Sequence, residues 1–242
     1  KYGVESRVRL NGTPDKLKTL VANGVYVILE NWLHPNEDIG HAILLRGYDD
    51  TKGVLVADDS YLGVGKEFPY EEFVNAQWKP FNWEYMPVYA PDKEELVRAI
   101  VGEEWDDRRM FENAVARNRE LASGNENDMH AWFNLGTSYF ALSEYEQAKT
   151  AFEKAKAIGW PKRMLWYHIQ PIQTYNALGE YAKALDLVKE ALWFNDSFAE
   201  AHLEAAIAHK GMGNIQFAKF EAQKALELAP ALKKAQDFLA SL

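Results

Sequence analysis

Apolar residues in the first part of the chain form short runs of both helix and strand length. Asp15 to Asn23 predicts a helix, because its apolar residues fall on one face and Gly24 follows at the usual stop position. Val25 to Leu29 is an unbroken apolar run rich in β-branched residues, which is typical of a buried strand. A helix followed by a buried strand is therefore expected in this segment.

A β-hairpin is predicted next along the chain. Apolar runs at 41–46 and 54–58 flank Gly47 to Gly53, a segment rich in turn-forming residues. A helix is expected from Pro69 to about Trp78, and a last strand over residues 84–89. Helices and strands mixed around a hairpin predict an α+β domain.

From Pro91 onward the pattern becomes helical and repeats. Alanine recurs at positions 114, 148, 184 and 218, at intervals of 34, 36 and 34 residues. The best copy contains Trp132, Leu135, Gly136, Tyr139, Tyr145, Ala148, Phe152, Ala155 and Pro161. This is the tetratricopeptide pattern, in which small residues let two antiparallel helices approach closely and large residues fill the gaps.

These patterns divide the chain into four segments. The α+β domain covers residues 1–91, a degenerate helical repeat or linker covers 92–128, three tetratricopeptide repeats cover 129–230, and a capping helix covers 231–242. Pro171 lies inside the first helix of the second repeat, so that helix should bend or break there.

Composition narrows the classes of partner. The 27 basic and 36 acidic residues give a net charge of −9, which argues against nucleic acid as a partner, because nucleic-acid binding needs a basic surface. No apolar run reaches the ~18 residues of a membrane helix, so no membrane insertion is expected. The chain contains no cysteine, which excludes disulfides, thiolate metal sites and a cysteine nucleophile within these 242 residues.

His41 and Asp59 are the strongest candidates for chemistry. Paired residues in a hairpin have a nearly constant sum, and a turn centred between Asp50 and Thr51 places His41 almost opposite Asp59. Directly opposed residues have Cβ atoms about 4.5–5.5 Å apart. A carboxylate at that distance can orient an imidazole, as in a nucleophile–His–Asp triad. The alternative is a histidine that only begins a strand, beside a solvated turn.

The surrounding residues share their order with a known family. Gly40 to Asp50 supplies a histidine, an apolar strand and Gly-Tyr-Asp; Asp59 to Gly63 follows the second strand, and Pro69 to Phe73 supplies Tyr-x-x-Phe. Together with Leu17 to Glu30, these segments resemble the C39-like peptidase domain, a bacterial cysteine peptidase domain of papain-like fold. Members of one subgroup are fused to tetratricopeptide repeats, and Arg163 to Tyr167 resembles a stretch seen in them.

The resemblance implies roles for individual residues. His41 would be the general base and Asp59 its orienting carboxylate, with Asp58 as the second choice if the register slips by one. It also implies a bacterial protein, facing the cell envelope. The family's cysteine nucleophile, and the glutamine beside its oxyanion hole, lie upstream of the first predicted helix and have no counterpart here. Ser60 is adjacent to Asp59 rather than across from His41, so it does not replace the cysteine.

Two explanations of the missing nucleophile stay open. The chain begins with Lys1, so an upstream segment that carries the cysteine is expected, and this chain alone should be inactive. The apolar sheet face beside His41 should then be covered, either by that segment as a separate fragment that stays bound or by a second molecule of the protein. Otherwise the domain has lost catalysis.

Other clusters suggest no cofactor or metal. His34, Glu37, Asp38 and His41 do not share a helix face, and Pro35 places them in a loop, so no metal site is predicted. Gly63 to Lys66 lacks the spacing of a phosphate-binding loop and is interpreted as a surface loop.

The repeats add a candidate binding surface. The residues expected on the concave face of the array are Phe133, Phe140, Trp166, Ile169, Leu203 and Ile207. An apolar groove of this kind should be covered, either by the peptidase-like domain of the same chain or by a peptide or protein partner. The sequence thus predicts a C39-like cysteine peptidase with a protein-interaction domain; the alternative is a non-catalytic scaffold that binds a peptide or protein.

Overall fold

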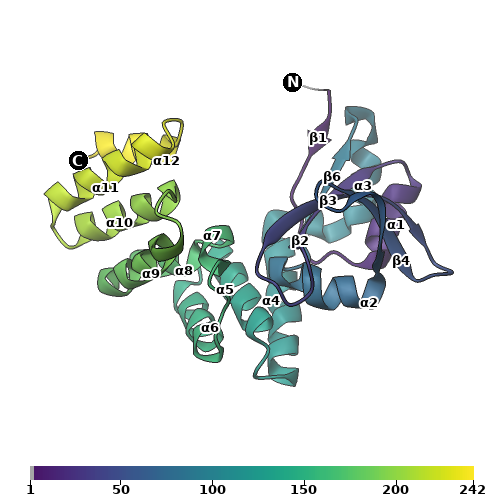
Figure 1. The fold of residues 1–242 in the computed structure, drawn as a ribbon, viewed down its shortest axis with the longest axis horizontal. Coiled ribbons are helices and arrows are strands. Elements are labelled where there is room, and N and C mark those ends of the chain that lie inside the picture. Colours follow the sequence, from purple (N-terminus) through teal and green to yellow (C-terminus); the bar gives the residue numbers. More distant parts are fainter. Residues whose placement is uncertain (1–2) are drawn as a thin grey trace. The chain divides into compact units, whose positions relative to one another are not determined.

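A computed structural model describes residues 3–242, which form two compact units (Figure 1). Unit 1 extends to Asn125 and unit 2 spans Glu126–Leu242. Unit 1 combines a sheet with helices, and unit 2 is helical throughout.

Unit 1 is built on one six-stranded antiparallel sheet in the order β1-β6-β2-β3-β4-β5. Its strands are β1 (Glu5–Ser6), β2 (Tyr26–Trp32), β3 (Gly40–Asp49), β4 (Val54–Asp59), β5 (Gly63–Pro69) and β6 (Tyr85–Tyr89). The predicted hairpin is confirmed as β3–β4. Strand β6 returns from far along the chain to lie beside β2.

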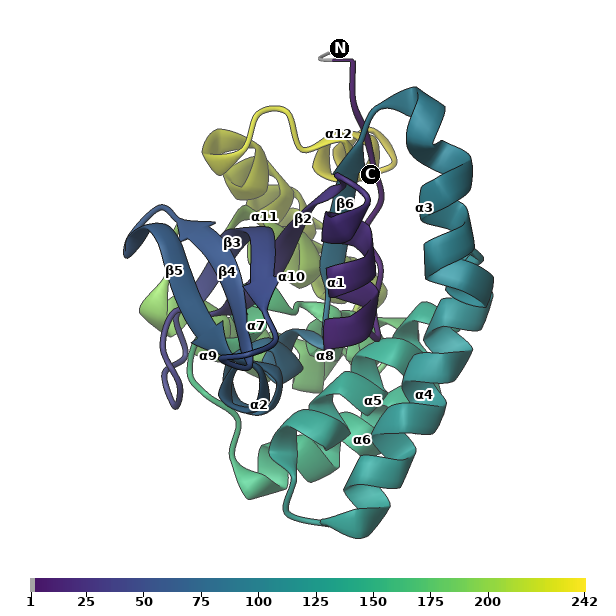
Figure 2. The same cartoon turned by 90° about the vertical axis from the view of Figure 1, so that its right-hand side faces the viewer.

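Alternation along the strands places one face of the sheet in the core. Val27 and Leu29 of β2, and Ile43 and Leu45 of β3, are fully buried on this inner face. Helix α1 (Pro14–Ala22) adds the buried Leu17 and Leu20 to the same core, as predicted from its one apolar face. Figure 2 shows α1 in front of the sheet beside β6, with the helix α3 (Glu94–Val101) to its right.

The interpretation of residues 63–66 as a loop is wrong. Gly63–Pro69 forms the edge strand β5, which pairs with β4 from Val54 to Asp59. Because β5 is paired on one side and solvated on the other, its apolar pattern is weak. Backbone hydrogen bonds to β4, which sequence periodicity does not report, define this strand.

The other helices of unit 1 follow and interrupt the sheet. They are α2 (Tyr70–Glu72), the π-helical segment η1 (Phe73–Trp78), the 3₁₀ turns η2 (Lys79–Phe81), η3 (Pro91–Lys93) and η4 (Gly102–Trp105), and the helices α3 (Glu94–Val101) and α4 (Asp107–Gly124). The predicted helix from Pro69 to Trp78 is thus α2 continued by η1, and its buried Phe73 and Trp78 join the core.

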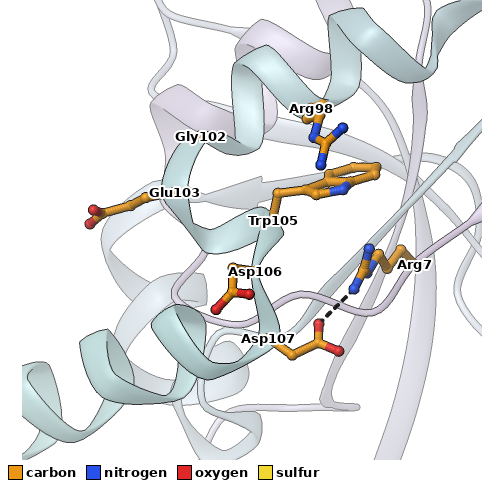
Figure 3. Close-up of a pocket in the computed structure, with 7 residues that line it drawn as sticks. All are labelled: Arg7, Arg98, Gly102, Glu103, Trp105, Asp106 and Asp107. Atoms are coloured by element: carbon orange, nitrogen blue, oxygen red, sulfur yellow. Dashed lines mark hydrogen bonds and ion pairs between the residues drawn. The ribbon is translucent and has the colours of Figure 1, made fainter.

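Trp105 anchors the turn between α3 and α4. The guanidinium groups of Arg98 and Arg7 lie 5.6 and 5.1 Å from its ring centroid, and Figure 3 shows both approaching the indole. Arg7 also forms an ion pair of 2.9 Å with Asp107 at the start of α4. The pocket at this turn, about 480 Å³, therefore mixes cations and anions.

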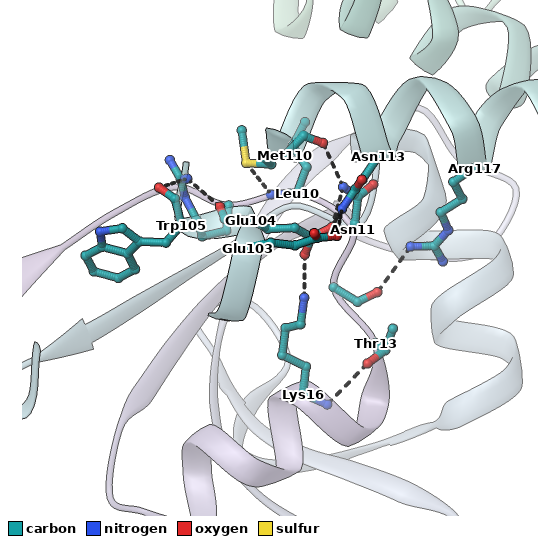
Figure 4. A network of polar contacts seen from close by, with 12 residues as sticks. Leu10, Asn11, Thr13, Lys16, Glu103, Glu104, Trp105, Met110, Asn113 and Arg117 are labelled. Carbon is teal, nitrogen blue, oxygen red and sulfur yellow. Dashed lines mark hydrogen bonds and ion pairs between the residues drawn. The ribbon is translucent and has the colours of Figure 1, made fainter. Parts of the chain in front are cut away.

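Glu104 is the centre of a buried polar network in the same region (Figure 4). Its carboxylate accepts hydrogen bonds from Asn11 Nδ2 at 2.9 Å and from Lys16 Nζ at 2.5 Å. The Asn11 amide also donates to the backbone oxygen of Met110. These bonds join the N-terminal segment to η4 and α4.

This network explains why unit 1 ends at Asn125. The sequence places the boundary at Pro91 and assigns 92–128 to a degenerate repeat or linker. The segment from η3 to the end of α4 is mostly helical. Hydrogen bonds from Arg9, Asn11 and Lys16 nevertheless attach it to the part of unit 1 that contains the sheet. Hydrogen bonds between side chains about 90 positions apart in sequence produce no local sequence pattern. The boundary of unit 1 therefore lies at Asn125, not at the predicted Pro91.

Unit 2 consists of three helical hairpins and a final helix. The hairpins are α5 (Met129–Ala141) with α6 (Tyr145–Ile158), α7 (Met164–Tyr167) and α8 (Gln170–Ala177) with α9 (Tyr181–Phe194), and α10 (Ala199–Gly211) with α11 (Ile215–Leu228); α12 (Lys233–Ala240) ends the array. The predicted break is confirmed, because α7 ends at Tyr167 and Pro171 lies in the first turn of α8.

Small residues set the spacing between these helices. A Cβ atom added at Gly136 would lie 2.5 Å from the ring of Phe152, so only glycine lets α5 approach α6 this closely. Gly211 has the same role against Tyr181, between α10 and α9. The repeat pattern indicates Gly136, whereas Gly211 lies outside the positions used to recognise the repeats.

Candidate functional site

His41 and Asp59 lie together at one end of the sheet. His41 Nε2 is 3.0 Å from Asp59 Oδ1, so the predicted proximity is present. The register differs from the prediction: Ile43 pairs with Asp59, and His41 pairs with Asn31 of β2. The turn is centred later than predicted, since Asp49 pairs with Val54, and the bulge between Leu45 and Gly47 offsets only part of this difference. Residues two apart share a face of a strand, so the diagonal pair still meets.

Asp59 is held as a fixed carboxylate. Its Oδ1 accepts hydrogen bonds of 2.7 Å from the backbone N–H groups of both Tyr61 and Leu62, and its side chain is 1% exposed. Burial acts to raise the pKa of Asp59, but these bonds and the nearby His41 outweigh burial and hold the pKa below its usual value. The carboxylate therefore stays charged beside the imidazole.

The approach of His41 to Asp59 is close but poorly directed. Although Nε2 is within ion-pair distance of Oδ1, it lacks a hydrogen bond of good geometry. Both backbone donors already bind the same oxygen. The geometry brings the two groups together without completing the orienting bond of a triad.

The neighbouring candidates lie elsewhere. Asp58 pairs with Arg46 at 2.8 Å and accepts a bond from the backbone of Gly65, so it is not the partner of His41. Ser60 is exposed in the turn after β4. The described residues 3–242 contain no group of three or more His, Asp or Glu side chains suited to a metal ion.

The sheet face beside His41 is covered by the chain itself. His41 is only 15% exposed at its side chain, and Ile43 and Ala57 on the same face are buried in the core with Phe73 of η1. The sequence predicts that a separate upstream segment or a second molecule covers this apolar face, whereas residues of the chain itself bury Ile43 and Ala57. Helix α1 and segment η1 supply the cover that the sequence pattern does not reveal.

Unit 2 contains a pocket of about 360 Å³, hereafter the groove pocket. Its walls come from the first two hairpins, from α10 and from α12, and the lining residues are Phe140, Tyr145, Gln173, Asn176, Ala177, Leu203, Glu204, Ile207, Lys234 and Phe238. Three of the six predicted groove residues meet here, namely Phe140, Leu203 and Ile207.

The other three predicted groove residues do not line this pocket. Phe133 is fully buried against Phe152 and Trp160, so its placement on an accessible groove is wrong. The indole of Trp166 donates to the backbone oxygen of Ala191, and Ile169 packs against the core of the second hairpin. The break before Pro171 alters this first helix, which is why the ideal repeat geometry fails here.

Polar residues of the groove pocket were missed by sequence reasoning. Glu204 is only 5% exposed, and its carboxylate accepts bonds from Gln173 Nε2 at 2.9 Å and Asn176 Nδ2 at 2.8 Å. The one available signal was a glutamate at an interior position of α10, flanked by Leu203 and Ala205.

None of the helices formed by residues 3–242 combines the length and apolar character that a membrane crossing requires.

Comparisons with known proteins support the repeat part of the chain. Residues 130–158 match the tetratricopeptide repeat family. A stretch of 93 residues is 30% identical to the DnaJ homolog subfamily C member 7 of Homo sapiens, and equally to that of Mus musculus. The match covers 38% of this chain and 18% of each relative, so it spans only about a fifth of their length.

Solved structures support the helical fold. The chain resembles the MamA RS-1 ArsTM double mutant with 22% identity, and MamA 41-end from Desulfovibrio magneticus RS-1 with 23% identity. Each match has a TM-score of 0.50 and covers 62% of this chain and 83% of the other. The chain thus carries a tetratricopeptide repeat in a helical array. The papain-like fold and peptidase activity implied by the resemblance find no support in these matches.

Proposed function

We propose that this protein is a scaffold that binds a peptide or protein partner in the groove pocket of unit 2. The matched repeat at residues 130–158 supports a protein-interaction role. Such arrays bind along the extended surfaces that stacked repeats create. This proposal takes the non-catalytic alternative from the sequence as the principal function.

The groove pocket is the observation that carries the proposal. It joins residues from three hairpins and α12, so a bound segment would contact the whole length of the array. Phe140, Ile207 and Phe238 offer apolar surface, and Glu204 and Asn176 offer polar groups. A few polar groups within an apolar lining are typical of binding pockets of about 300–1,000 Å³.

Selection from a random peptide display library against the purified chain tests the scaffold. Selected peptides should lose at least about tenfold in affinity for Ile207→Glu, which places a charge in the groove pocket; that loss corresponds to ~1.4 kcal/mol. Ile215→Glu is the matched control, because Ile215 is 43% exposed and lies outside the pocket. Failure to select any peptide, or equal losses in the two variants, would contradict the proposal.

The His41–Asp59 contact favours a second candidate function. We propose that the pair is the general-base half of a cysteine peptidase whose nucleophile comes from outside these 242 residues. The 3.0 Å contact with a charged, buried Asp59 supports this role. A thiolate must be supplied, because the chain itself has no cysteine.

Hydrolysis assays on two forms of the protein test this candidate. The 242-residue chain should show no thiol-dependent peptide hydrolysis. A longer natural form that carries an upstream cysteine should show it, and His41→Ala should abolish it while His34→Ala leaves it intact. Hydrolysis that survives His41→Ala would remove His41 from the mechanism.

A further inference from the structure

The lining of the groove pocket is rich in hydrogen-bond acceptors. Glu204 of α10 is a buried carboxylate in this lining, and each of its two oxygens accepts one amide hydrogen bond, from Gln173 and from Asn176. A carboxylate can accept about four hydrogen bonds. Both oxygens therefore retain the capacity to bind a further donor.

Asn176 adds to this excess of acceptors. Its amide nitrogen donates to the Glu204 side chain at 2.8 Å and to the Glu204 backbone oxygen at 3.0 Å. Its Oδ1 is buried and has no hydrogen-bond donor in the part of the chain described. Since the amide nitrogens of both Gln173 and Asn176 bind Glu204, the polar side of the pocket favours a ligand that donates.

The buried carboxylate also lacks a close cation. Within residues 3–242, Glu204 forms no ion pair; Lys234 of α12 lines the same pocket and acts on Glu204 only at longer range. Burial raises the pKa of Glu204, while the amide bonds and Lys234 act to lower it. A buried charge that is not paired costs free energy, and a cation placed against it removes that cost.

We propose that the groove pocket binds a peptide segment through an arginine side chain, whose guanidinium pairs with the Glu204 carboxylate. A guanidinium fits because its planar fork can bind both carboxylate oxygens at once. Its aliphatic stem would lie against Phe140 and Ile207, which line the same pocket. This inference rests on the proposed scaffold function and specifies the partner of that site.

Charge makes the pocket selective. A partner segment with an acidic residue at this position would place a second negative charge beside a buried one, which is unfavourable. An apolar residue would fill the space but leave the carboxylate without a cation. The expected order of affinity is therefore arginine, then lysine, then norleucine, then glutamate.

Four labelled nine-residue peptides test this order by fluorescence anisotropy with the complete 242-residue chain. They carry arginine, lysine, norleucine or glutamate at the central position, between leucine and phenylalanine. The arginine peptide should bind at least about tenfold more tightly than the norleucine peptide, equivalent to ~1.4 kcal/mol. Equal affinities, tighter binding of the glutamate peptide, or no binding by any of the four would overturn the inference.

Two substitutions on α10 locate the effect. Glu204→Gln should remove the preference for arginine over norleucine, whereas Glu200→Gln, an equal change of charge at an exposed position of the same helix, should preserve it. Retention of the preference in a folded Glu204→Gln variant would contradict the inference. Circular dichroism establishes whether the variants fold.

Lys234→Ala provides an independent test if Glu204→Gln fails to fold. Removing the competing cation should strengthen binding of the arginine peptide relative to the norleucine peptide, because Lys234 acts on the same carboxylate; an unchanged or weakened preference for arginine would contradict the inference. If library peptides bind in the groove pocket but show no preference for arginine, only this inference fails. If no library peptide binds there, the scaffold function fails as well.

Discussion

Different kinds of contact stabilise the interior of unit 1 and the interior of unit 2. In unit 2, hairpins of neighbouring helices pack through alanine and glycine, and the contacting residues lie close in sequence. In unit 1, the sheet is completed by β6, and Glu104 ties α4 to Asn11 and Lys16 from about 90 positions upstream. The comparison shows that a local repeat leaves a clear sequence signal, whereas buried polar contacts between distant segments leave almost none.

The largest expected effect tests the packed core of unit 2. Phe133→Ala should destabilise this unit by about 3–5 kcal/mol, because it empties a fully buried aromatic site between Phe152 and Trp160. Hydrogen exchange with mass spectrometry should show loss of protection in unit 2 while β3 and β4 remain protected. Phe140→Ala on the same helix, at a partly exposed position, is the control and should cost less. Equal costs would mean that Phe133 is not a core residue.

The second prediction tests the long-range polar network of unit 1. Glu104→Gln should cost about 2–3 kcal/mol, because Lys16 loses its charged partner in a buried site. Protection should fall in residues 7–16 and 102–117 and stay unchanged in unit 2. The adjacent Glu103→Gln removes the same charge at an exposed position and should have little effect. A uniform loss across both units would argue against two separate packing systems.

The third prediction concerns pH and unit 1. Burial, assisted by the charge of Glu30, raises the pKa of Glu84 to about 7. In the unfolded chain the carboxyl has its ordinary pKa of 4.5. The folded state therefore binds more protons between these two values, so stability should fall as pH rises from about 4.5 to 7.

Glu84→Gln should remove most of this pH dependence. The difference in free energy of unfolding between wild type and variant should change by on the order of 2 kcal/mol between pH 4.5 and pH 8. Urea denaturation at each pH measures this difference. Glu71→Gln, at an exposed position, should leave the profile unchanged. A profile that is identical in wild type and Glu84→Gln would exclude Glu84 as its source.

The smallest expected effect compares two helical glycines. Gly136→Ala should destabilise unit 2 by about 1 kcal/mol, because the new methyl group meets the Phe152 ring at 2.5 Å. Gly124→Ala at the end of α4 meets nothing within 4 Å, so it should stabilise unit 1 by up to about 1 kcal/mol through helix propensity. Thermal denaturation distinguishes these opposite signs, and effects of the same sign would contradict the packing argument.

Much of the secondary structure follows from local pattern. Periodicity indicated α1, β2, the β3–β4 hairpin, the three helical hairpins and the break before Pro171, because each depends on residues near in sequence. It missed β5, whose exposed edge has little apolar alternation. It also placed the unit boundary at Pro91 instead of after Asn125, since the bonds that hold α4 to unit 1 come from distant residues.

The same distinction between local and long-range contacts applies to the candidate sites. The sequence by itself determined that His41 and Asp59 share a hairpin, because turn residues between two apolar runs predict strand pairing. The repeat period placed Phe140, Leu203 and Ile207 in one groove, but it placed Phe133 there as well. Only the tertiary structure decided the diagonal register of the His–Asp pair, the burial of Phe133, and the meeting of Glu204 with Asn176 and Gln173. Contacts of this kind depend on a bulge, a helix break and the packing of separate helices. Those features are set by the sum of many weak interactions, and no short segment of sequence contains them.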